Sequence, residues 1–429
     1  MLSVLLAANV ADGHVAPMLG VAEQFAGNGH RVRFLAGDRF ADAVRGAGAE
    51  FLPWPADAQI DHQAVLAQDL AEGGRPRGAK AIAHSVDRLF IAPAPAQYAA
   101  LRQAIDAEPT DAVLVEYTVI GAGALAISPQ PRPPIVTCGI SALGLSSVDT
   151  APWGLGILPR ADMLGRVRNR LLNWMAKNVV LRGPQRQVEN LMRTLTGAEV
   201  RGFFMDGAAR ADHYAQFTVP GFEYPRRNLP PSVSFIGPVM RASTRVAKLP
   251  KWWGDMDGDV PVIHVSQGTM ANEDLAELVL PTVRALAGHR ALVVVSTGGR
   301  PVDVLGQLPP NTRAAEFLPY GHLMPKVDVF VTNGGYGGVH FALGHGVPMV
   351  VAGDTEDKVE TACRVEWSGT GVNLRTGTPT EAQIAAAVDR VLTEQSFREQ
   401  AQALQAEIES APGMAGLEQI ATELVARRS

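Results

Sequence analysis

The 429-residue chain has little of what several classes of protein require. Its two cysteines, Cys138 and Cys363, lie far apart and form no C-x-x-C pair, which indicates neither a disulfide framework nor a zinc site. Aromatic residues make up only 6% of the chain, and the net charge is −5. Nucleic-acid binding calls for a basic excess and for aromatic side chains on which bases stack. We therefore expect no nucleic-acid partner.

Long apolar runs are also missing. No stretch of about 18 uninterrupted apolar residues occurs, so we expect no transmembrane helix. The first residues carry no basic leader, and their apolar run is short, so we expect a first strand there rather than a signal peptide. These features predict a cytoplasmic protein without stable membrane insertion. The sequence contains no indication of an oligomeric state.

What remains is an ordinary globular composition, with 47% hydrophobic and 19% charged residues, long enough for two or three domains. Short apolar runs alternate with helical spacing in both halves, which is typical of parallel sheets covered by helices on both faces. In the first half we expect strands at Ser3–Ala7, Arg31–Ala36, 112–115 and 134–137, and helices at 18–26 and 122–127. In the second half we expect strands at 262–265, 291–295, 314–317, 329–331 and 349–351, and helices at 274–287 and 339–344.

A proline-rich passage separates the two halves, and prolines suit an extended linker. The sequence therefore predicts two doubly wound, Rossmann-like α/β domains that face a cleft, followed by a helical tail rich in Ala, Glu, Gln and Leu. We place the N-terminal domain at 1–225, the linker at 226–260 and the C-terminal domain at 261–410. A last helix at 411–429 is expected to pack back on the N-terminal domain.

One segment of the first half differs from the rest. Between 160 and 182, apolar residues recur every three or four positions among several arginines, which predicts a long amphipathic helix with a basic face.

Two loops of the first half carry candidates for acid–base chemistry. His14 follows the first strand at a turn opened by Gly13, and Glu116 ends the strand at 112–115. The carboxyl ends of parallel strands share one edge of the sheet, where ligands bind. A histidine there can take a proton, and a carboxylate can orient it. The alternatives are a histidine with a purely structural role at the helix start and a solvated glutamate.

Two loops of the second half carry candidates for anion binding. Ser266-Gln267-Gly268-Thr269 follows one strand, and Asn333 to Gly338 follows another. Small residues at a helix N-terminus leave N–H groups directed at a phosphate. The alternative is a pair of tight turns.

Two other patterns are set aside. The acidic run 255–259 resembles a metal loop, but Ser266 stands where an EF-hand needs its bidentate glutamate. The P-loop and Rossmann fingerprints are absent, which disfavours ATP hydrolysis and nicotinamide chemistry.

Taken in order, these segments resemble family 1 glycosyltransferases of the GT-B fold, in the bacterial macrolide-glycosyltransferase-like branch that decorates natural products. Gly13-His14-Val15-Ala16-Pro17 resembles the G-H-x-x-P loop, and Ser266-Gln267-Gly268-Thr269 resembles the S-x-G-T turn. The run from Asn333 to Pro348 resembles the H-G-G-x-G motif with its following G-V-P. Glu356-Asp357-Lys358 stands where the family holds sugar hydroxyls. The chain departs from the family pattern at Glu116 (usually Asp), Asn333 (usually His), Phe341 (often Glu) and Lys358 (usually Gln).

The resemblance implies an enzyme that transfers a sugar from a nucleoside diphosphate, a dTDP- or UDP-sugar, to a hydroxyl of a largely apolar small molecule. It implies inversion at the anomeric carbon, no metal and no further cofactor. His14 and Glu116 are then the catalytic pair. The implied donor-binding residues are Ser266, Gly268, Thr269, Phe317, Leu318, Asn333, Gly335, Tyr336, Gly337, Gly338, Asp357 and Lys358.

The segment at 160–182 would line an apolar acceptor pocket or simply pack in the core. Three other functions stay open at this point: a sugar-nucleotide epimerase of the same fold, a glycosyltransferase that acts on membrane lipids, and a noncatalytic activator of a partner glycosyltransferase.

Overall fold

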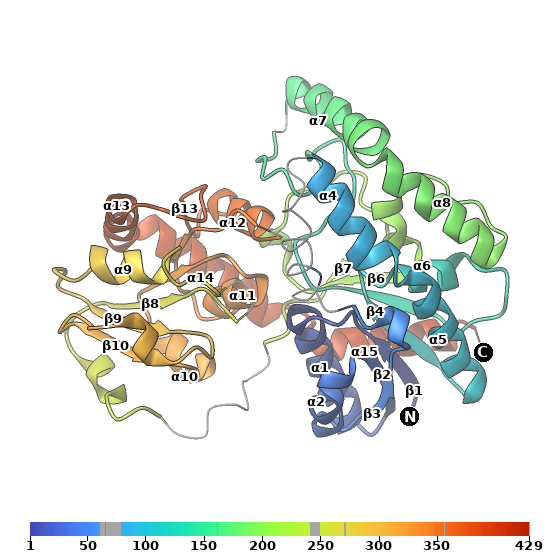
Figure 1. The fold of residues 1–429 in the computed structure, drawn as a ribbon, viewed down its shortest axis with the longest axis horizontal. Helices are drawn as coiled ribbons and strands as arrows, with labels where there is room; N and C mark the ends of the chain where they lie inside the picture. Colours follow the sequence, from blue (N-terminus) through green and yellow to red (C-terminus); the bar gives the residue numbers. More distant parts are fainter. Residues whose placement is uncertain are drawn as a thin grey trace.

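The computed structural model describes residues 1–60, 65, 79–160, 162–240, 249–269, 272–355 and 357–428. It contains two parallel sheets, each covered by helices, which lie side by side in Figure 1. The strand orders are β3-β2-β1-β4-β5-β6-β7 and β10-β9-β8-β11-β12-β13. The predicted α/β class, with two doubly wound domains and a helical C-terminal region, is confirmed.

The central strands of the first sheet are mostly apolar. Its central strands are wholly buried, because helices cover both of its faces. The strands are β1 (Ser3–Ala7), β2 (Arg31–Ala36), β3 (Glu50–Pro53), β4 (Ala112–Glu116), β5 (Ile135–Gly139), β6 (His213–Gln216) and β7 (Val233–Phe235). The helices are α1 (Asp12–Gly27), α2 (Ala41–Gly46), α4 (Ala79–Val86), α5 (Ala94–Ala107), α6 (Ile120–Ile127), α7 (Met163–Met175) and α8 (Arg182–Thr196).

Three strands of this sheet were not expected from the sequence: β3, β6 and β7. β7 falls inside the range 226–260 that the sequence predicts as a linker, and it pairs with β6. Prolines are tolerated beside an edge strand, which is where β7 lies. The first sheet therefore extends as far as Phe235.

The second sheet follows the same construction, with an apolar core on each face. Its strands are β8 (Val262–Ser266), β9 (Leu292–Ser296), β10 (Thr312–Ala315), β11 (Val329–Thr332), β12 (Met349–Val351) and β13 (Gly371–Asn373). The helices of this half and the tail are α9 (Val279–Ala285), α10 (Tyr320–Leu323), α11 (Tyr336–Leu343), α12 (Lys358–Trp367), α13 (Glu381–Thr393), α14 (Gln395–Ser410) and α15 (Gly413–Ala426). The strand expected at 314–317 lies two residues earlier, and β13 was not expected.

The end of the chain returns to the first half. Leu417 and Ala421 of α15 are fully buried in the core beneath the first sheet. Glu418 accepts a hydrogen bond from His30 at 2.8 Å, and Arg428 pairs with Asp212 at 2.6 Å. In Figure 1, α15 accordingly lies beside the first sheet, away from α13.

The two halves meet where strands of the first sheet end and helices of the second begin. The side-chain amide of Gln216, at the end of β6, donates to the hydroxyl of Tyr336 at 3.0 Å. The side chains of Thr218 and His340 are joined by a hydrogen bond of 2.6 Å. The carboxyl edge of the first sheet therefore faces the second half.

Candidate active site

His14 lies in the first turn of α1, directly after the loop that follows β1. Its Nδ1 atom is 3.2 Å from Oε1 of Glu116, the last residue of β4. The His14 side chain is 18% exposed, whereas the Glu116 side chain is fully buried. The structure thus brings together the two residues that the sequence selected as a base and its partner.

Glu116 is held as a carboxylate by several donors. Its oxygens accept hydrogen bonds from the backbone N–H of Asn9 at 3.1 Å and of Thr118 at 2.8 Å. The Thr118 hydroxyl donates to Oε1 at 2.6 Å. Burial alone would raise the pKa of Glu116, but the nearby His14 and the Thr118 hydrogen bonds outweigh burial and lower that pKa below its usual value. Glu116 is therefore charged at neutral pH.

A second layer of polar side chains supports this pair. The Asn9 side-chain amide donates to the Thr118 hydroxyl at 2.7 Å, and the Gln97 amide donates to Asn9 Oδ1 at 2.6 Å. The Thr118 hydroxyl also lies 3.1 Å from His14 Nδ1. The sequence analysis missed these three residues. Asn9 and Thr118 follow the ends of β1 and β4, so the rule that selected His14 and Glu116 could have found them, but nothing in the sequence marks Gln97.

This geometry fixes how His14 can react. A carboxylate and a hydroxyl oxygen beside Nδ1 favour the tautomer that carries its proton there. The acceptor lone pair of the neutral ring is then at Nε2. A proton taken at Nε2 creates an imidazolium whose charge the buried Glu116 carboxylate balances. The pair can therefore act as a general base with a built-in counterion.

The two glycine-rich turns of the second half are joined to one another. β8 and β11 are neighbours, and Ser266 is opposite Thr332 in their register. The Asn333 side-chain amide donates to the carbonyl oxygen of Gln267 at 2.5 Å. Gly268 and Gly334 have φ values of +74° and +84°, a left-handed backbone that favours glycine. Asn333 therefore uses its N–H donor to hold the turn after β8 against the turn after β11.

The N-terminus of α11 follows directly. Gly335 occupies the N-cap position with no side-chain cap, so the first backbone N–H groups, which include those of Gly337 and Gly338, are left for another acceptor. A Cβ placed on Gly337 would meet nothing within 4 Å, so space lies beside this turn. The Tyr336 side chain, by contrast, is 8% exposed and lies against Gln216 in the first half. Tyr336 can serve an anion only through its backbone N–H.

The other predicted donor-binding residues are placed as follows. The Leu318 side chain is buried in the core. The Phe317 ring lies over Gly299, where an added Cβ would come within 2.7 Å of Cζ. Asp357 is the N-cap residue of α12 and Lys358, which is buried, is its first residue. Glu356 lies outside the described residues.

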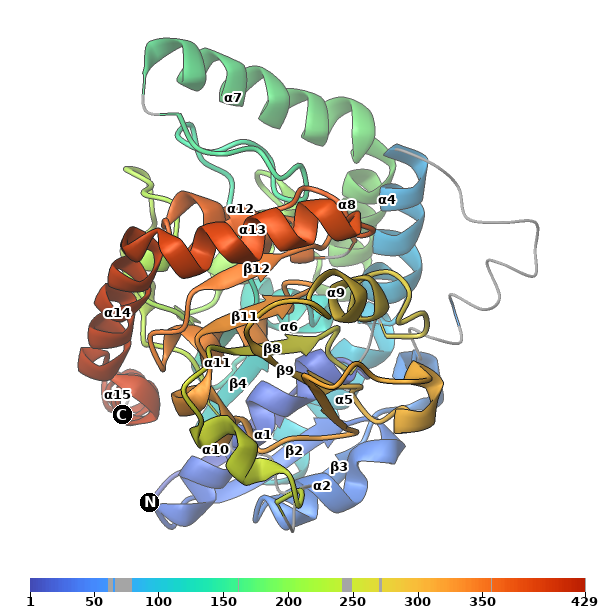
Figure 2. The ribbon, with the colours of Figure 1, turned by 90° about the vertical axis from the view of Figure 1, so that its left-hand side faces the viewer.

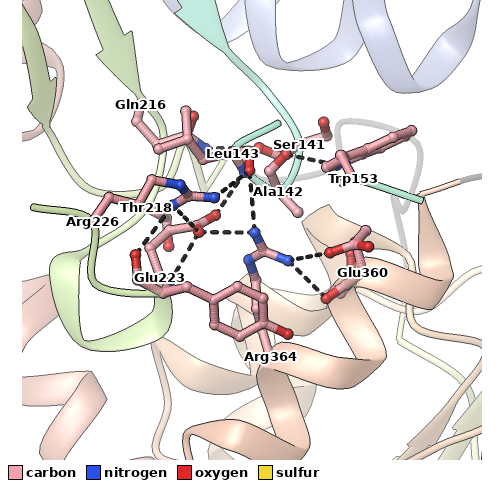
Figure 3. Close-up of polar contacts among 12 residues, drawn as sticks. Ser141, Ala142, Leu143, Trp153, Gln216, Thr218, Glu223, Arg226, Glu360 and Arg364 are labelled. Carbon is pink, nitrogen blue, oxygen red and sulfur yellow. Dashed lines mark hydrogen bonds and ion pairs between the residues drawn. The ribbon is translucent and has the colours of Figure 1, made fainter. Parts of the chain in front are cut away.

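α12 also anchors the first half to the second. Its Arg364 is 1% exposed and pairs with Glu223 of the first half and with Glu360 of its own helix, both at 2.9 Å. Glu360, whose contact with Arg364 is drawn in Figure 3, also accepts the backbone N–H groups of Gly154 at 2.8 Å and Gly156 at 3.1 Å. One helix thus carries Asp357 and Lys358 at its start and holds the loop after β5 one turn later. The sequence analysis missed this cluster, because no local pattern pairs Glu223 with a residue so distant in the chain.

The described part of the chain has no side chains grouped as ligands for a metal ion. Among the residues that the structure describes, no group of three His, Cys, Asp or Glu side chains is close enough to hold one. Asp255 pairs with Arg313 at 2.7 Å, and Asp257 pairs with Lys326. The acidic run 255–259 therefore faces cations of its own chain.

The basic helix expected at 160–182 is present but is differently oriented. It is divided into α7, a π-helical turn at Ala176–Val180 and the start of α8. The outward apolar side chains do not fill a core, because Leu164, Val167 and Leu171 are all more than half exposed. Asn173, Ala176 and Leu181 of the same stretch line a cavity beside the loop after β5. Core packing is therefore wrong for these outward side chains, because periodicity identifies an apolar face but not what lies against it. The acceptor pocket stays a prediction.

Comparisons with known proteins identify relatives of the whole chain. Residues 281–426 match a family model described as the C-terminal domain of erythromycin biosynthesis protein CIII-like proteins. The chain is 39% identical to 4'-demethylrebeccamycin synthase of Lentzea aerocolonigenes, over 92% of this chain and 93% of that protein. It is 33% identical to UDP-glycosyltransferase 2 of Phaeomoniella chlamydospora, over 99% and 96%.

Solved structures agree in fold. The calicheamicin glycosyltransferase CalG4 superposes with a TM-score of 0.73 at 24% identity, over the whole of both chains. The glycosyltransferase VinC in complex with dTDP superposes with a TM-score of 0.67 at 19% identity, over 99% of this chain and 100% of that one.

Proposed function

Because the chain belongs to the nucleotide-sugar-dependent glycosyltransferases that tailor natural products, we propose that it transfers its sugar to a hydroxyl of a largely apolar small molecule with inversion. The observation that carries the proposal is the contact of 3.2 Å between His14 and the buried Glu116. A base with its own counterion is what an alcohol or phenol needs to become a nucleophile.

In the proposed reaction, His14 Nε2 takes the proton of the acceptor hydroxyl. The acceptor oxygen forms a bond to the anomeric carbon, on the face opposite the diphosphate. The bond from that carbon to the diphosphate oxygen breaks, and its electron pair leaves with the diphosphate. Attack opposite the leaving group inverts the anomeric centre. Glu116 keeps His14 oriented and balances the imidazolium.

The leaving diphosphate is assigned to the joined turns after β8 and β11. Backbone N–H groups near Gly268 and at the start of α11 would donate to its oxygens, and the helix end adds a partial positive charge. Asn333 supports this site by joining the two turns. Phe317 would flank the nucleotide base, while Asp357 and Lys358 would hold sugar hydroxyls.

Turnover should persist in excess EDTA, because N–H groups rather than a metal ion are proposed to stabilise the leaving charge. The measurement is the initial rate before and after chelation, with magnesium or manganese added back. Activity that collapses with chelator and returns with metal would contradict the assignment of the phosphate site.

The donor nucleotide is predicted from Phe341, which lies on α11 with its ring edge-to-face against Tyr320 at 5.8 Å. Phenylalanine cannot accept hydrogen bonds from ribose hydroxyls, and a buried 2′-hydroxyl without a partner costs about 1–3 kcal/mol. A dTDP-sugar has no such hydroxyl, so we expect it to be used at least as well as the UDP-sugar. VinC, which shares the fold, was solved in complex with dTDP.

The test is kcat/KM for dTDP-glucose and UDP-glucose with one accepted acceptor. Phe341→Glu should shift the ratio towards UDP-glucose, and Tyr320→Phe serves as a control that alters the neighbouring ring but adds no ribose acceptor. A preference of the wild type for UDP-glucose above about tenfold would defeat the argument, because an unpaired 2′-hydroxyl can only disfavour the UDP-sugar.

The function as a whole is tested by a panel of nucleotide sugars against apolar alcohols and phenols, read by mass spectrometry. A product heavier than the acceptor by one sugar residue, with its anomeric configuration opposite to that of the donor, is the expected result. Epimerised donor without an acceptor product would favour an epimerase instead. No turnover with any pair, in a protein that binds nucleotide, would favour a noncatalytic role.

A further inference from the structure

α7 is attached to the protein by its polar face. Gly165 and Asn169 are buried, and Asn169 donates to the carbonyl oxygen of Val148 at 3.2 Å. Asn173, one turn later, donates to the carbonyls of Ser147 and Thr150, both at 3.1 Å. These contacts bind the helix to the loop after β5. The arrangement is the reverse of a surface helix, which normally buries its apolar face.

The apolar face of the segment points outward as a consequence. We call its members the α7 stripe, and each is between 41% and 75% exposed: Met163, Leu164, Val167, Leu171, Trp174, Met175 and Val179. Apart from two adjacent pairs, they recur every three or four residues, so they lie along one side of the helix. More than half of the exposed large hydrophobic side chains of the described residues belong to this one stripe. A contiguous apolar surface of this kind marks an interaction site.

The flanks of the α7 stripe are basic. Between 160 and 186 the sequence has seven Arg or Lys residues and one acidic residue, in a chain whose net charge is −5. Arg166 and Arg170, four residues apart, follow one edge of the stripe, and Arg168 lies at the other edge beside Leu171. A second copy of this chain that docked by its own α7 stripe would therefore bring cations against cations, since the segment supplies only Asp162 to offset them.

We propose that the α7 stripe docks on the surface of a membrane that contains anionic lipids. Apolar side chains with an exposed tryptophan, between rows of arginine, suit a helix that lies in the plane of the headgroups, with its apolar face buried and its cations on lipid phosphates. Both views place α7 at the outer edge of the molecule, so its length can lie on a flat surface (Figures 1 and 2). Among helices of the described residues, none combines the length and the apolar character needed to cross a membrane, so the contact is peripheral.

Docking in this position would place the loop after β5, which α7 covers, near the lipid surface. An apolar acceptor dissolves in that surface, so docking would bring the enzyme to its acceptor. This docking does not depend on His14 or on the identity of the donor. The inference can therefore fail while the proposed function holds, and the reverse is also true.

The test is flotation of the full-length protein with two kinds of vesicle: phosphatidylcholine alone, and equal parts of phosphatidylcholine and phosphatidylglycerol. We expect binding to the second kind and little to the first. Raising the salt should weaken binding, because the Debye length falls from about 10 Å at 0.1 M to about 3 Å at 1 M. Absence of binding to the phosphatidylglycerol vesicles would overturn the proposal.

Variants separate the two parts of the surface. Leu171→Asp with Trp174→Asp should reduce binding at least tenfold, while Val304→Asp with Leu249→Asp, which are about half exposed elsewhere, should leave it unchanged. Arg166→Gln with Arg170→Gln should reduce it by about 25-fold, since each cation near an anionic surface contributes roughly fivefold. Equal binding of the stripe variant and the wild type would overturn the proposal.

Two further measurements keep the outcome clear. The stripe variant should retain its melting temperature and its rate with a water-soluble acceptor, because the substituted side chains are exposed. In sedimentation without vesicles, the wild type and the stripe variant should have the same oligomeric state. Self-association of that kind, without vesicle binding, would assign the α7 stripe to a second copy of the chain and would overturn the membrane surface as its partner.

Discussion

Replacing His14 with alanine should lower the rate of sugar transfer by on the order of 10²–10⁴ while nucleotide binding stays close to that of the wild type. The imidazole is the group placed to take the acceptor proton. Glu116 cannot replace it as the base, because backbone and hydroxyl donors occupy both of its oxygens. The joined turns that would bind the diphosphate lie in the second half and should be unaffected. The measurements are kcat and KM for the donor, and nucleotide affinity by calorimetry.

The control for this prediction is Glu116→Gln. Glutamine keeps an oxygen for His14 Nδ1, so orientation is partly retained and the loss of rate should be smaller than in His14→Ala. Both carboxylate oxygens accept a backbone N–H, however, so the new NH₂ group must face a donor at Asn9 or Thr118. The melting temperature should therefore also fall, which His14→Ala should not cause to the same extent. Unchanged transfer in His14→Ala would remove His14 from the role of base.

Replacing Arg364 with methionine should destabilise the protein by about 3–5 kcal/mol, because it leaves the buried Glu223 and Glu360 with an uncompensated charge. Burial would lower the pKa of the Arg364 guanidinium, but Glu223 and its other partners outweigh burial and raise that pKa, so Arg364 is charged at any ordinary pH. Glu223 keeps Arg226 at 3.4 Å, a longer contact. Denaturant unfolding, followed by tryptophan fluorescence, measures the change.

An exposed ion pair supplies the comparison. Arg390 and Glu394, four residues apart on α13 and its C-cap, are about half exposed, and Arg390→Met should cost only about 0.3–0.5 kcal/mol. The two substitutions remove the same charge and add the same side chain. If their effects on unfolding are equal, the cluster in Figure 3 does not join the halves in the way described.

The contrast between residues predicted and residues missed has a physical basis. β1 and β2 were predicted to the residue, because each is a short, mostly apolar and mostly buried segment next to a helix. β7 is three residues long and follows two prolines, so its pairing with β6 depends on the sheet already being present. Local sequence does not contain that information.

The candidate site divides in the same way. His14 follows β1 and Glu116 ends β4, so both lie at the carboxyl edge of one sheet. That placement can be predicted from the alternation of strand and helix signals along the sequence. Arg364 and Glu223 belong to different halves, so only the packing of the halves brings them together. For the α7 stripe, the sequence correctly predicts the helical spacing but not the orientation of the helix. The side that faces the protein is the one with the asparagines.

The return of α15 to the first half has a consequence for synthesis of the chain. Leu417 and Ala421 fill the first core, yet they are made long after β7. At about 5–20 residues per second, the first domain would wait roughly 10–40 s with that face of its core open. Force measurements on the nascent chain should detect the final docking only once Ala421 has emerged. During this interval the domain that carries His14 depends on the second domain being completed before its own core can close.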